Sequence, residues 1–164
     1  MCVDLAHRHG HLRFIVQDYD DIVSYGRSSY ASEKLPIEWH ANNVFDPQPV
    51  KGADVYLVRH LLVDFPDAEA VQILKHVADA MSDTSRMLIA EGIMSEEFGE
   101  ESNRTLNTID LHLLCLFNSK ERTVRQWKAL VESVGKGLEV TNLWLGDGGA
   151  DGQGMIEIMR KPKV

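Results

Sequence analysis

The sequence lacks the features that mark membrane proteins and nucleic-acid binders. No window approaches the roughly 18 consecutive apolar residues that span a bilayer, and the first residues show no signal-peptide pattern. Basic side chains are outnumbered by acidic ones, 17 to 25, which gives a net charge of -8. Because general binders of nucleic acid or acidic membranes derive their affinity from clustered Lys and Arg, this charge argues against both classes.

Cysteine is also scarce, and no metal-ligand pattern stands out. Cys2 and Cys115 are far apart, so in a chain without a secretion signal we predict two free thiols and a reducing, cytoplasmic compartment. The histidines of "HRHGH" (His7, His9 and His11) have no carboxylate or cysteine partner at a fixed spacing. That pattern favours solvated side chains over a metal site.

The hydrophobic pattern predicts strands that alternate with helices. The 164 residues, 44 % of them hydrophobic, suffice for a single domain over residues 1–164 with an ordinary core. Strand patterns cover residues 12–17, 37–41, 54–62, 86–94, 138–145 and 154–160. Helical periods cover residues 67–82, 106–117 and 123–135. This alternation predicts an α/β fold with a mostly parallel sheet and helices on its faces.

Local signals refine this expectation. Asp67 and Thr123 are predicted to cap the helices that follow them, and Gly135 to end the last helix. The helix over 106–117 is apolar on nearly all sides, so we expect it to be buried. The last two strand patterns flank "GDGGADGQ", which lacks the distal Glu of a calcium-binding loop and is typical of a hairpin turn.

Several acidic residues lie near predicted strand ends, where α/β proteins collect ligands. Asp18 directly follows a strand pattern, so it either binds a ribose or caps the helical segment "YDDIVSYG". Glu91 lies within an apolar strand pattern, where a carboxylate must be paired, hydrogen-bonded or directed into a cleft. Glu121 stands just before a helix, and a charged helix start would also account for it.

Five segments occur in an order that resembles a known enzyme family. They are "LRFIVQD", "DPQPVKGADVYLVRHLLVDFPDAEAVQIL", "RMLIAEGIM", "DLHLLCLFNSKERT" and "QWKALVESVG". Over almost the whole chain, they resemble the plant- and fungal-type small-molecule O-methyltransferases that use S-adenosylmethionine, most closely the fungal members of secondary metabolism. The resemblance implies a Rossmann-like methyltransferase sheet that ends in an antiparallel hairpin.

The resemblance also implies roles for individual residues. Asp18 would bind the cofactor ribose, Asn43 and Val44 would lie beside the adenine, and Arg59 would lie near the methionine portion. The family usually has Asp at the position of Asn43. An amide does not accept from the adenine amino group in the same way, so we expect adenine recognition to differ here.

The segment "RHLLVDFPD" (residues 59–67) departs from the family at the catalytic position. The family reads Leu-His-Asp-Trp there, and its histidine takes the proton of the substrate hydroxyl, flanked by two glutamates that match Glu91 and Glu121. Here Val63 stands at the histidine position, followed by Asp64. Because valine accepts no proton and loss of a general base costs on the order of 10²- to 10⁴-fold, simple His-driven methylation is not expected.

A histidine does occur nearby, since His60 lies three residues before Val63. In an extended strand, that spacing puts the two side chains on opposite faces. We therefore expect His60 to be a poor substitute base unless the backbone bends. The candidate polar groups for chemistry are then Arg59, Asp64, Glu91 and Glu121.

Members of this family are more than twice as long as the present chain. They begin with a helical dimerisation and substrate-binding domain, followed by a first strand and a Gly-rich loop that wraps the cofactor. The resemblance implies that this sequence starts where the helix after that loop ends, so we expect the first strand and the Gly-rich loop to be missing from it. The flanking strands (residues 12–17 and 54–62) could pair directly or through a partner chain, or the chain is a fragment. A substitute strand over residues 2–5 ("CVDL") is a further alternative.

Two functions remain open from the sequence. In the first, the chain acts with S-adenosylmethionine, if its pocket is complete, on a polyketide, alkaloid or other small aromatic substrate. Its methyl transfer would then be impaired, or replaced by a cofactor-promoted dehydration or pericyclic cyclisation. In the second, it is a non-catalytic remnant or the partner of a full-length paralogue. The sequence fixes neither the substrate nor the oligomeric state, for which a homodimer and a paralogue heterodimer are both alternatives.

Overall fold

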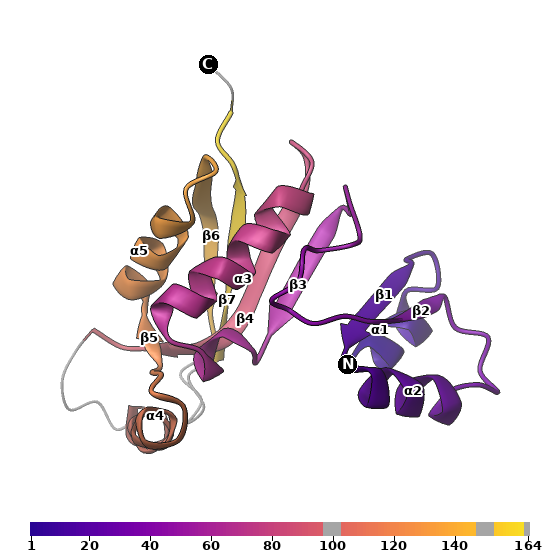
Figure 1. The fold of residues 1–164 in the computed structure, drawn as a ribbon, viewed down its shortest axis with the longest axis horizontal. Coiled ribbons are helices and arrows are strands. Elements are labelled where there is room, and N and C mark those ends of the chain that lie inside the picture. Colours follow the sequence, from indigo (N-terminus) through magenta and orange to yellow (C-terminus); the bar gives the residue numbers. More distant parts are fainter. Residues whose placement is uncertain (97–102, 147–152, 163–164) are drawn as a thin grey trace. The chain divides into compact units, whose positions relative to one another are not determined.

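The computed structural model describes residues 1–96, 103–146 and 153–162. They form two compact units, Met1–Asp46 and Pro47–Val164, and each is described by itself. The helices are α1 (Cys2–Arg8), α2 (Asp20–Ser29), the 3-10 helix η1 (Leu62–Asp64), α3 (Asp67–Ala80), α4 (Asn103–Phe117) and α5 (Val124–Val134). The strands are β1 (Phe14–Asp18), β2 (Ile37–Ala41), β3 (Val55–Arg59), β4 (Arg86–Met94), β5 (Arg122–Thr123), β6 (Leu138–Leu145) and β7 (Gln153–Arg160), as Figure 1 shows.

The first unit is built on two parallel strands, β1 and β2, with Phe14 opposite Ile37. Helix α2 packs against both strands. Its Gly26 lies so close to Trp39 that a Cβ atom there would be 2.3 Å from the indole ring. The ring of Tyr30 stacks on the same indole with 6.3 Å between centroids. Trp39 thus fixes the helix to the sheet, and only glycine fits at position 26.

Two alternatives from the sequence are wrong in this unit. Residues 2–5 lie in helix α1 and do not form a substitute strand. Asp18 does not cap α2 either, because the N-cap residue is Tyr19, and the Asp18 carboxylate accepts from the Tyr19 backbone N–H at 2.8 Å. The physical reason is that β1 runs through Asp18 and the helix starts one residue too late for the carboxylate to reach its first turn.

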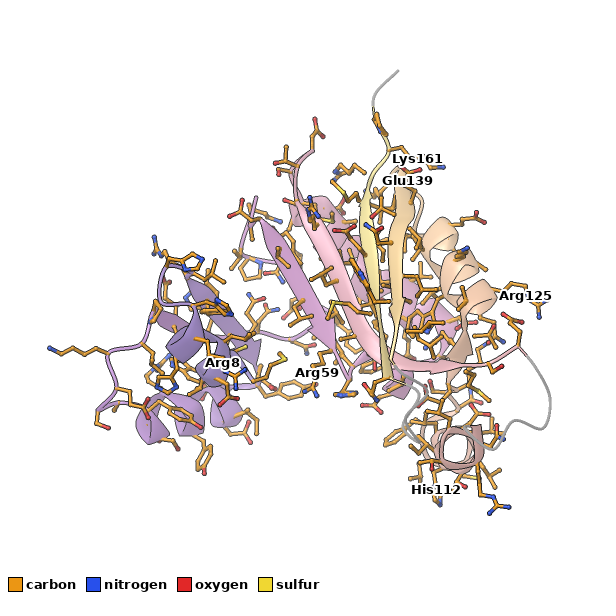
Figure 2. All side chains as sticks on the ribbon, turned by 180° about the vertical axis from the view of Figure 1, so that it is seen from behind. Arg8, Arg59, His112, Arg125, Glu139 and Lys161 are labelled. Carbon is orange, nitrogen blue, oxygen red and sulfur yellow. The ribbon has the colours of Figure 1, made fainter. Side chains whose placement is uncertain are left out.

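The second unit contains a sheet in the order β3-β4-β7-β6, with β5 paired to the end of β4. Strands β3, β4 and β5 are parallel, whereas β7 is antiparallel to β4 and β6. Helices α3 and α5 lie side by side on one face (Figure 1), and Figure 2 looks onto the other face. The core between sheet and helices is apolar. Its most fully buried side chains include Ile73, Leu74, Met87, Ile89, Trp127, Ile156 and Ile158.

The predicted mixed α/β sheet with a final antiparallel hairpin is confirmed. Strands β2, β4 and β6 have the predicted bounds, and β6 pairs with β7 as expected. Most of the predicted hairpin turn, residues 147–152, lies outside the described residues. Within the part of the chain that the structure describes, β1 and β3 belong to separate sheets, so direct pairing of these two strands is not found.

Helix α4 corrects another expectation, because its apolar residues are not mostly buried. Leu106 and Leu113 are 1 % and 6 % exposed, whereas Leu111 and Leu116 are 60 % and 72 % exposed. The buried pair is seven residues apart and so shares one helix face. That face packs on η1 and β4. The apolar residues on all sides of this helix did not show how much of its surface would be buried by neighbouring elements.

A buried arginine ties the segment after β3 to the start of α5. Arg122 is fully buried and donates to the carbonyl oxygens of Leu62 and Phe65, each at 2.9 Å, and to the carboxylate of Asp67 at 2.9 Å. Its guanidinium lies 5.1 Å from the centre of the Trp127 ring. Asp67 therefore pairs with Arg122 and does not serve as the predicted N-cap of α3, which is Pro66.

The predicted cap of α5 is confirmed. Thr123 accepts from the backbone N–H of Gln126, and the Gln126 side chain accepts from the Thr123 backbone, which completes a capping box. Gly135 follows the helix with a φ of 70°, which glycine adopts without strain. Both ends of α5 are thus encoded locally. The fixed start of α5 holds β5, which directly precedes it, in place beside the end of β4.

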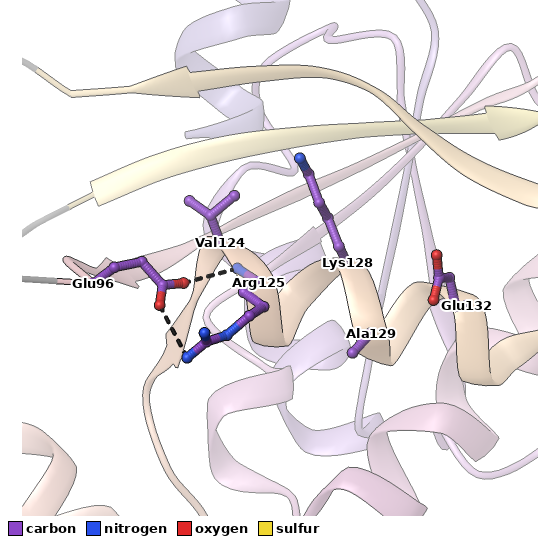
Figure 3. Close-up of a pocket in the computed structure, with 6 residues that line it drawn as sticks. All are labelled: Glu96, Val124, Arg125, Lys128, Ala129 and Glu132. Carbon is purple, nitrogen blue, oxygen red and sulfur yellow. Dashed lines mark hydrogen bonds and ion pairs between the residues drawn. The ribbon is translucent and has the colours of Figure 1, made fainter.

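We expect Arg122→Lys to lower the free energy of unfolding by about 2–4 kcal/mol. A lysine keeps the charge but cannot donate to two carbonyls and a carboxylate in one plane, and the buried carbonyls lose partners. Urea unfolding monitored by circular dichroism measures the change. Arg125→Lys is the matched control, since Arg125 is exposed and pairs with Glu96 at 3.2 Å (Figure 3). The control should change stability by less than about 1 kcal/mol; equal losses in both variants would contradict the structural role of Arg122.

Candidate functional site

The polypeptide bends sharply at the carboxyl end of β3. His60 has a φ of 46°, a left-handed conformation that is uncommon for residues other than glycine. Its backbone N–H donates to the carbonyl of Ala90 at 3.2 Å, and η1 begins two residues later at Leu62. The expectation that His60 and Val63 lie on opposite faces of an extended strand is therefore wrong. Its premise fails because β3 ends at Arg59.

The carboxylate of Glu91, on the neighbouring strand β4, holds this bend. The residue is 1 % exposed, and its Oε1 accepts from the backbone N–H groups of Leu61 at 2.8 Å and Leu62 at 2.9 Å. The prediction that a carboxylate in this strand must be hydrogen-bonded is confirmed. The other oxygen, Oε2, is buried, has no hydrogen-bond partner among the residues that the structure describes, and lies 3.8 Å from Nδ1 of His60. Burial raises the pKa of Glu91 above its usual value, against the two backbone hydrogen bonds.

Glu121 is the second buried carboxylate of this region. It is 6 % exposed, and its Oε2 also has no hydrogen-bond partner. Its backbone N–H donates to Asp110 of α4 at 2.7 Å. A Cβ atom on Gly92 would lie 2.7 Å from Glu121 Oε2, so the carboxyl group occupies space that only glycine leaves open. Burial first, then the charges of Glu91 and Asp110, raise the pKa of Glu121 to about 7.

Asp64 completes the acidic group. It ends η1, and burial raises its pKa above the ordinary value, while its own charge contributes to the raised pKa of Glu91 and Glu121. Asp110 was not predicted, although it is the one acidic residue in the segment "LNTIDLHLLCLF" and that isolation was a usable signal. The guanidinium of Arg122 opposes these carboxylates and lowers the pKa of both glutamates.

This arrangement can hold a proton near neutral pH. Several carboxyl groups that lie close together in a buried site do not all ionise together, because like charges repel and burial disfavours each charged form. Glu121 therefore exchanges its proton in the range where enzymes carry out acid–base chemistry. Val63 contributes no titratable atom to this group. Its carbonyl oxygen, like that of Phe65, accepts from the hydroxyl of Ser119, which fixes the backbone of η1.

The predicted site residues fall into two sets. Val63, Asp64, Glu91 and Glu121 come together in the second unit, around the bend after β3, and Arg59 is exposed at the carboxyl end of that strand (Figure 2). The remaining predicted residues, Asp18, Asn43 and Val44, lie in the first unit.

The first unit presents the polar groups of Asp18 and Asn43 on its surface. Asp18 is exposed at the carboxyl end of β1. Asn43 is exposed too, and its side-chain oxygen accepts from the backbone N–H of Phe45 at 3.0 Å. Val44, between them in this turn, is partly buried. The Asn43 side-chain oxygen therefore forms a hydrogen bond within its own turn, which the sequence alone did not show.

Other clusters add no second site. His7, His9 and His11 are exposed, His7 pairs with Glu33 at 2.7 Å, and the described residues contain no group of three potential metal ligands. Cys2 and Cys115 are free thiols, as predicted.

A shallow pocket on the outer side of α5 includes none of the predicted site residues. Glu96, Val124, Arg125, Lys128, Ala129 and Glu132 line it (Figure 3). Glu96 pairs with Arg125 across it. No helix in the described ranges is long and apolar enough to cross a membrane.

The sequence and the fold match known methyltransferases. The O-methyltransferase domain family matches residues 2–136. The chain is 38 % identical over 141 residues to the sterigmatocystin 8-O-methyltransferase of Aspergillus parasiticus, which covers 85 % of this chain and 32 % of that relative. LepI in complex with S-adenosylmethionine and a pericyclic reaction enzyme each match with a TM-score of 0.86 and 28 % identity, over 98 % of this chain and 40 % of theirs. The chain thus spans about a third of the length of this curated relative.

The raised pKa of Glu121 predicts a pH-dependent stability. Between the ordinary value of 4.5 and about 7, the folded protein binds a proton that the unfolded chain has lost, so stability falls as pH rises through this window. Glu121→Gln removes the titration. We expect the variant to become more stable than the wild type as the pH rises from 5 to 8, by up to about 3 kcal/mol.

Urea unfolding at several pH values measures this difference. Glu132→Gln is the control, because Glu132 is exposed on α5 and outside the acidic group. If the free energies of unfolding of the wild type and of Glu121→Gln differ by the same amount at every pH from 5 to 8, the raised pKa of Glu121 is contradicted.

Proposed function

Since the chain belongs to the O-methyltransferase domain family, we propose that it supports S-adenosylmethionine-dependent chemistry on a small-molecule hydroxyl, with methyl transfer impaired at Val63. The observation that carries this proposal is the buried pair Glu91 and Glu121, which persists while no titratable side chain stands at position 63. Two unpaired buried carboxyl oxygens are costly to retain in a fold that has no use for them. Residues 1–164 are then one partial methyltransferase-like domain.

The donor groups of the first unit fit the nucleoside end of this cofactor. A carboxylate at a strand end, as at Asp18, is the group that accepts from ribose hydroxyls in Rossmann-like proteins. Asn43 and Val44 would border the adenine. When bound, the cofactor supplies an electrophilic methyl group on a sulfonium. The Asn43 oxygen accepts from the Phe45 N–H and keeps a second lone pair that the adenine amino group could use, with a weaker bond than the carboxylate of Asp would form.

One relative supports the proposed substrate class. It is named as a sterigmatocystin 8-O-methyltransferase, and this chain is 38 % identical to it over 32 % of its length; an aromatic hydroxyl is the substrate group proposed here. An aromatic hydroxyl is a poor nucleophile until it loses its proton, so a proton acceptor is the group on which the rate depends. Without a base at position 63, the reaction needs either a substrate that is already acidic or another group of the site that takes the proton.

A second candidate is a cofactor-assisted cyclisation. The similarity to a pericyclic reaction enzyme, with a TM-score of 0.86, favours it. Glu121 with a pKa of about 7 is partly protonated at neutral pH and could donate a hydrogen bond to a carbonyl of a cyclising substrate. Such a cyclisation would not need a histidine at position 63.

Cofactor binding separates both enzymatic candidates from a non-catalytic remnant. We expect S-adenosylhomocysteine to bind with a dissociation constant of about 100 μM or less, measured by titration calorimetry. Asp18→Ala should weaken binding at least about tenfold, by removing the acceptor for two ribose hydroxyls. Asp21→Ala, on the exposed face of α2, is the matched control and should bind as the wild type does. Absence of binding up to millimolar ligand would favour the remnant.

Restoring a base should restore methyl transfer. We expect Val63→His to raise the rate of methylation of sterigmatocystin by about 10²-fold or more, because Glu91 and Glu121 are already in place to orient the imidazole. Product formation is measured by mass spectrometry with S-adenosylmethionine as donor. Val63→Gln is the control, since it adds a polar side chain that accepts no proton. If the two variants show the same rate, the loss of a base at position 63 is not what limits the reaction.

A further inference from the structure

The conformation of His60 is held from both sides. A left-handed conformation costs a residue other than glycine roughly 1 kcal/mol or more and persists where surrounding contacts fix it. Here the N–H of His60 is bonded to Ala90 on β4, and the next two N–H groups, of Leu61 and Leu62, are bonded to Oε1 of Glu91. The bend is therefore anchored to β4 at two consecutive residues, Ala90 and Glu91.

This bend brings the imidazole to the one carboxylate oxygen of Glu91 that lacks a hydrogen bond. Nδ1 of His60 is 3.8 Å from Oε2 of Glu91. The side chain of Glu91 is fully buried, whereas that of His60 is 42 % exposed. The imidazole thus has a buried carboxylate on one side and is still accessible to a molecule that arrives from solvent. An imidazole backed by a carboxylate is the arrangement that catalytic histidines use to take a proton.

Resting on the proposed function, we propose that His60 is the proton acceptor of this site, in the role that Val63 cannot fill. The imidazole nitrogen that does not face Glu91 takes the proton of an aromatic hydroxyl. The hydroxyl oxygen forms a bond to the methyl carbon of the sulfonium donor, and the carbon–sulfur bond breaks, with its electron pair left on sulfur. The products are the methyl ether, the neutral thioether and a protonated His60, whose charge the Glu91 carboxylate balances.

The charged groups of the neighbouring elements are compatible with a positive imidazole. Glu91 on β4 and Asp64 on η1 are negative when ionised, and Glu121 and Asp110 add further acidic groups from the β5 side and from α4. The guanidinium of Arg122 is the counter-charge that acts on both glutamates, and its hydrogen bonds go to Leu62, Phe65 and Asp67.

The first test uses a chromogenic phenol and needs no methyl transfer. We expect 4-nitrocatechol, added at a pH about one unit below the pKa of its acidic hydroxyl, to shift to its phenolate absorption on binding to the wild type in the presence of S-adenosylhomocysteine. His60→Asn should abolish the shift, because asparagine tolerates a positive φ but accepts no proton. His112→Asn, on the exposed side of α4 (Figure 2), is the matched control and should keep it. A wild type that causes no more phenolate absorption than His60→Asn overturns the assignment.

The second test separates a base from a merely structural residue. In the natural Val63 background, His60→Asn should lower sterigmatocystin methylation about 10²-fold or more. In a Val63→His background the same substitution should have little effect, because the restored histidine takes the proton. An equal loss in both backgrounds means that His60 only supports the fold and overturns the proposal.

The two tests distinguish the proposal from the function on which it rests. If phenolate formation depends on His60 but the wild type transfers no methyl group, His60 is supported as the base and the proposed methylation is overturned. Methyl transfer that His60→Asn leaves unchanged supports the proposed function and overturns the base.

Discussion

The second unit depends on one constraint, which is that the carboxylate of Glu91 is buried within an apolar strand. A carboxylate in that position is tolerable only if it finds donors. It finds them in two backbone N–H groups, of Leu61 and Leu62, and this fixes where β3 ends and where η1 begins. The left-handed conformation of His60 and the place of Val63 follow from the same bend. The local chain path is thus set by a side chain thirty residues away in sequence.

The neighbouring groups reinforce this arrangement and give it chemical meaning. Gly92 leaves room for the Glu121 carboxyl, and Asp110 holds the backbone of Glu121 from α4. Burial and like charges then raise the pKa of Glu121 to about 7. Arg122 connects β5 to the carbonyls around η1, so the acidic groups and the bend are held by one buried cation. The raised pKa of Glu121 lowers the stability of the fold at neutral pH, where this same group can hold a proton.

Much of this fold could be read from local signals, whereas the bend could not. Strand β4 and the box that caps α5 are encoded by adjacent residues, and Glu91 was notable because it is charged in an apolar run. The sequence drew attention to His60 but gave no signal of the bend there, since a positive φ is expected from glycine and not from histidine. Asp110 and the exposed side of α4 depend on which elements happen to lie opposite, which periodicity does not reveal. The functional residues that sequence missed are those placed by long-range contacts.

The most direct measurement is amide hydrogen exchange at Leu61 and Leu62, compared between the wild type and Glu91→Ala. If Glu91 holds the bend, both amides exchange slowly in the wild type. In Glu91→Ala they lose that protection, while amides in the pair of β6 and β7 keep theirs. If the two amides exchange freely in the wild type, the carboxylate does not hold the bend, and the placement of His60 beside it is contradicted.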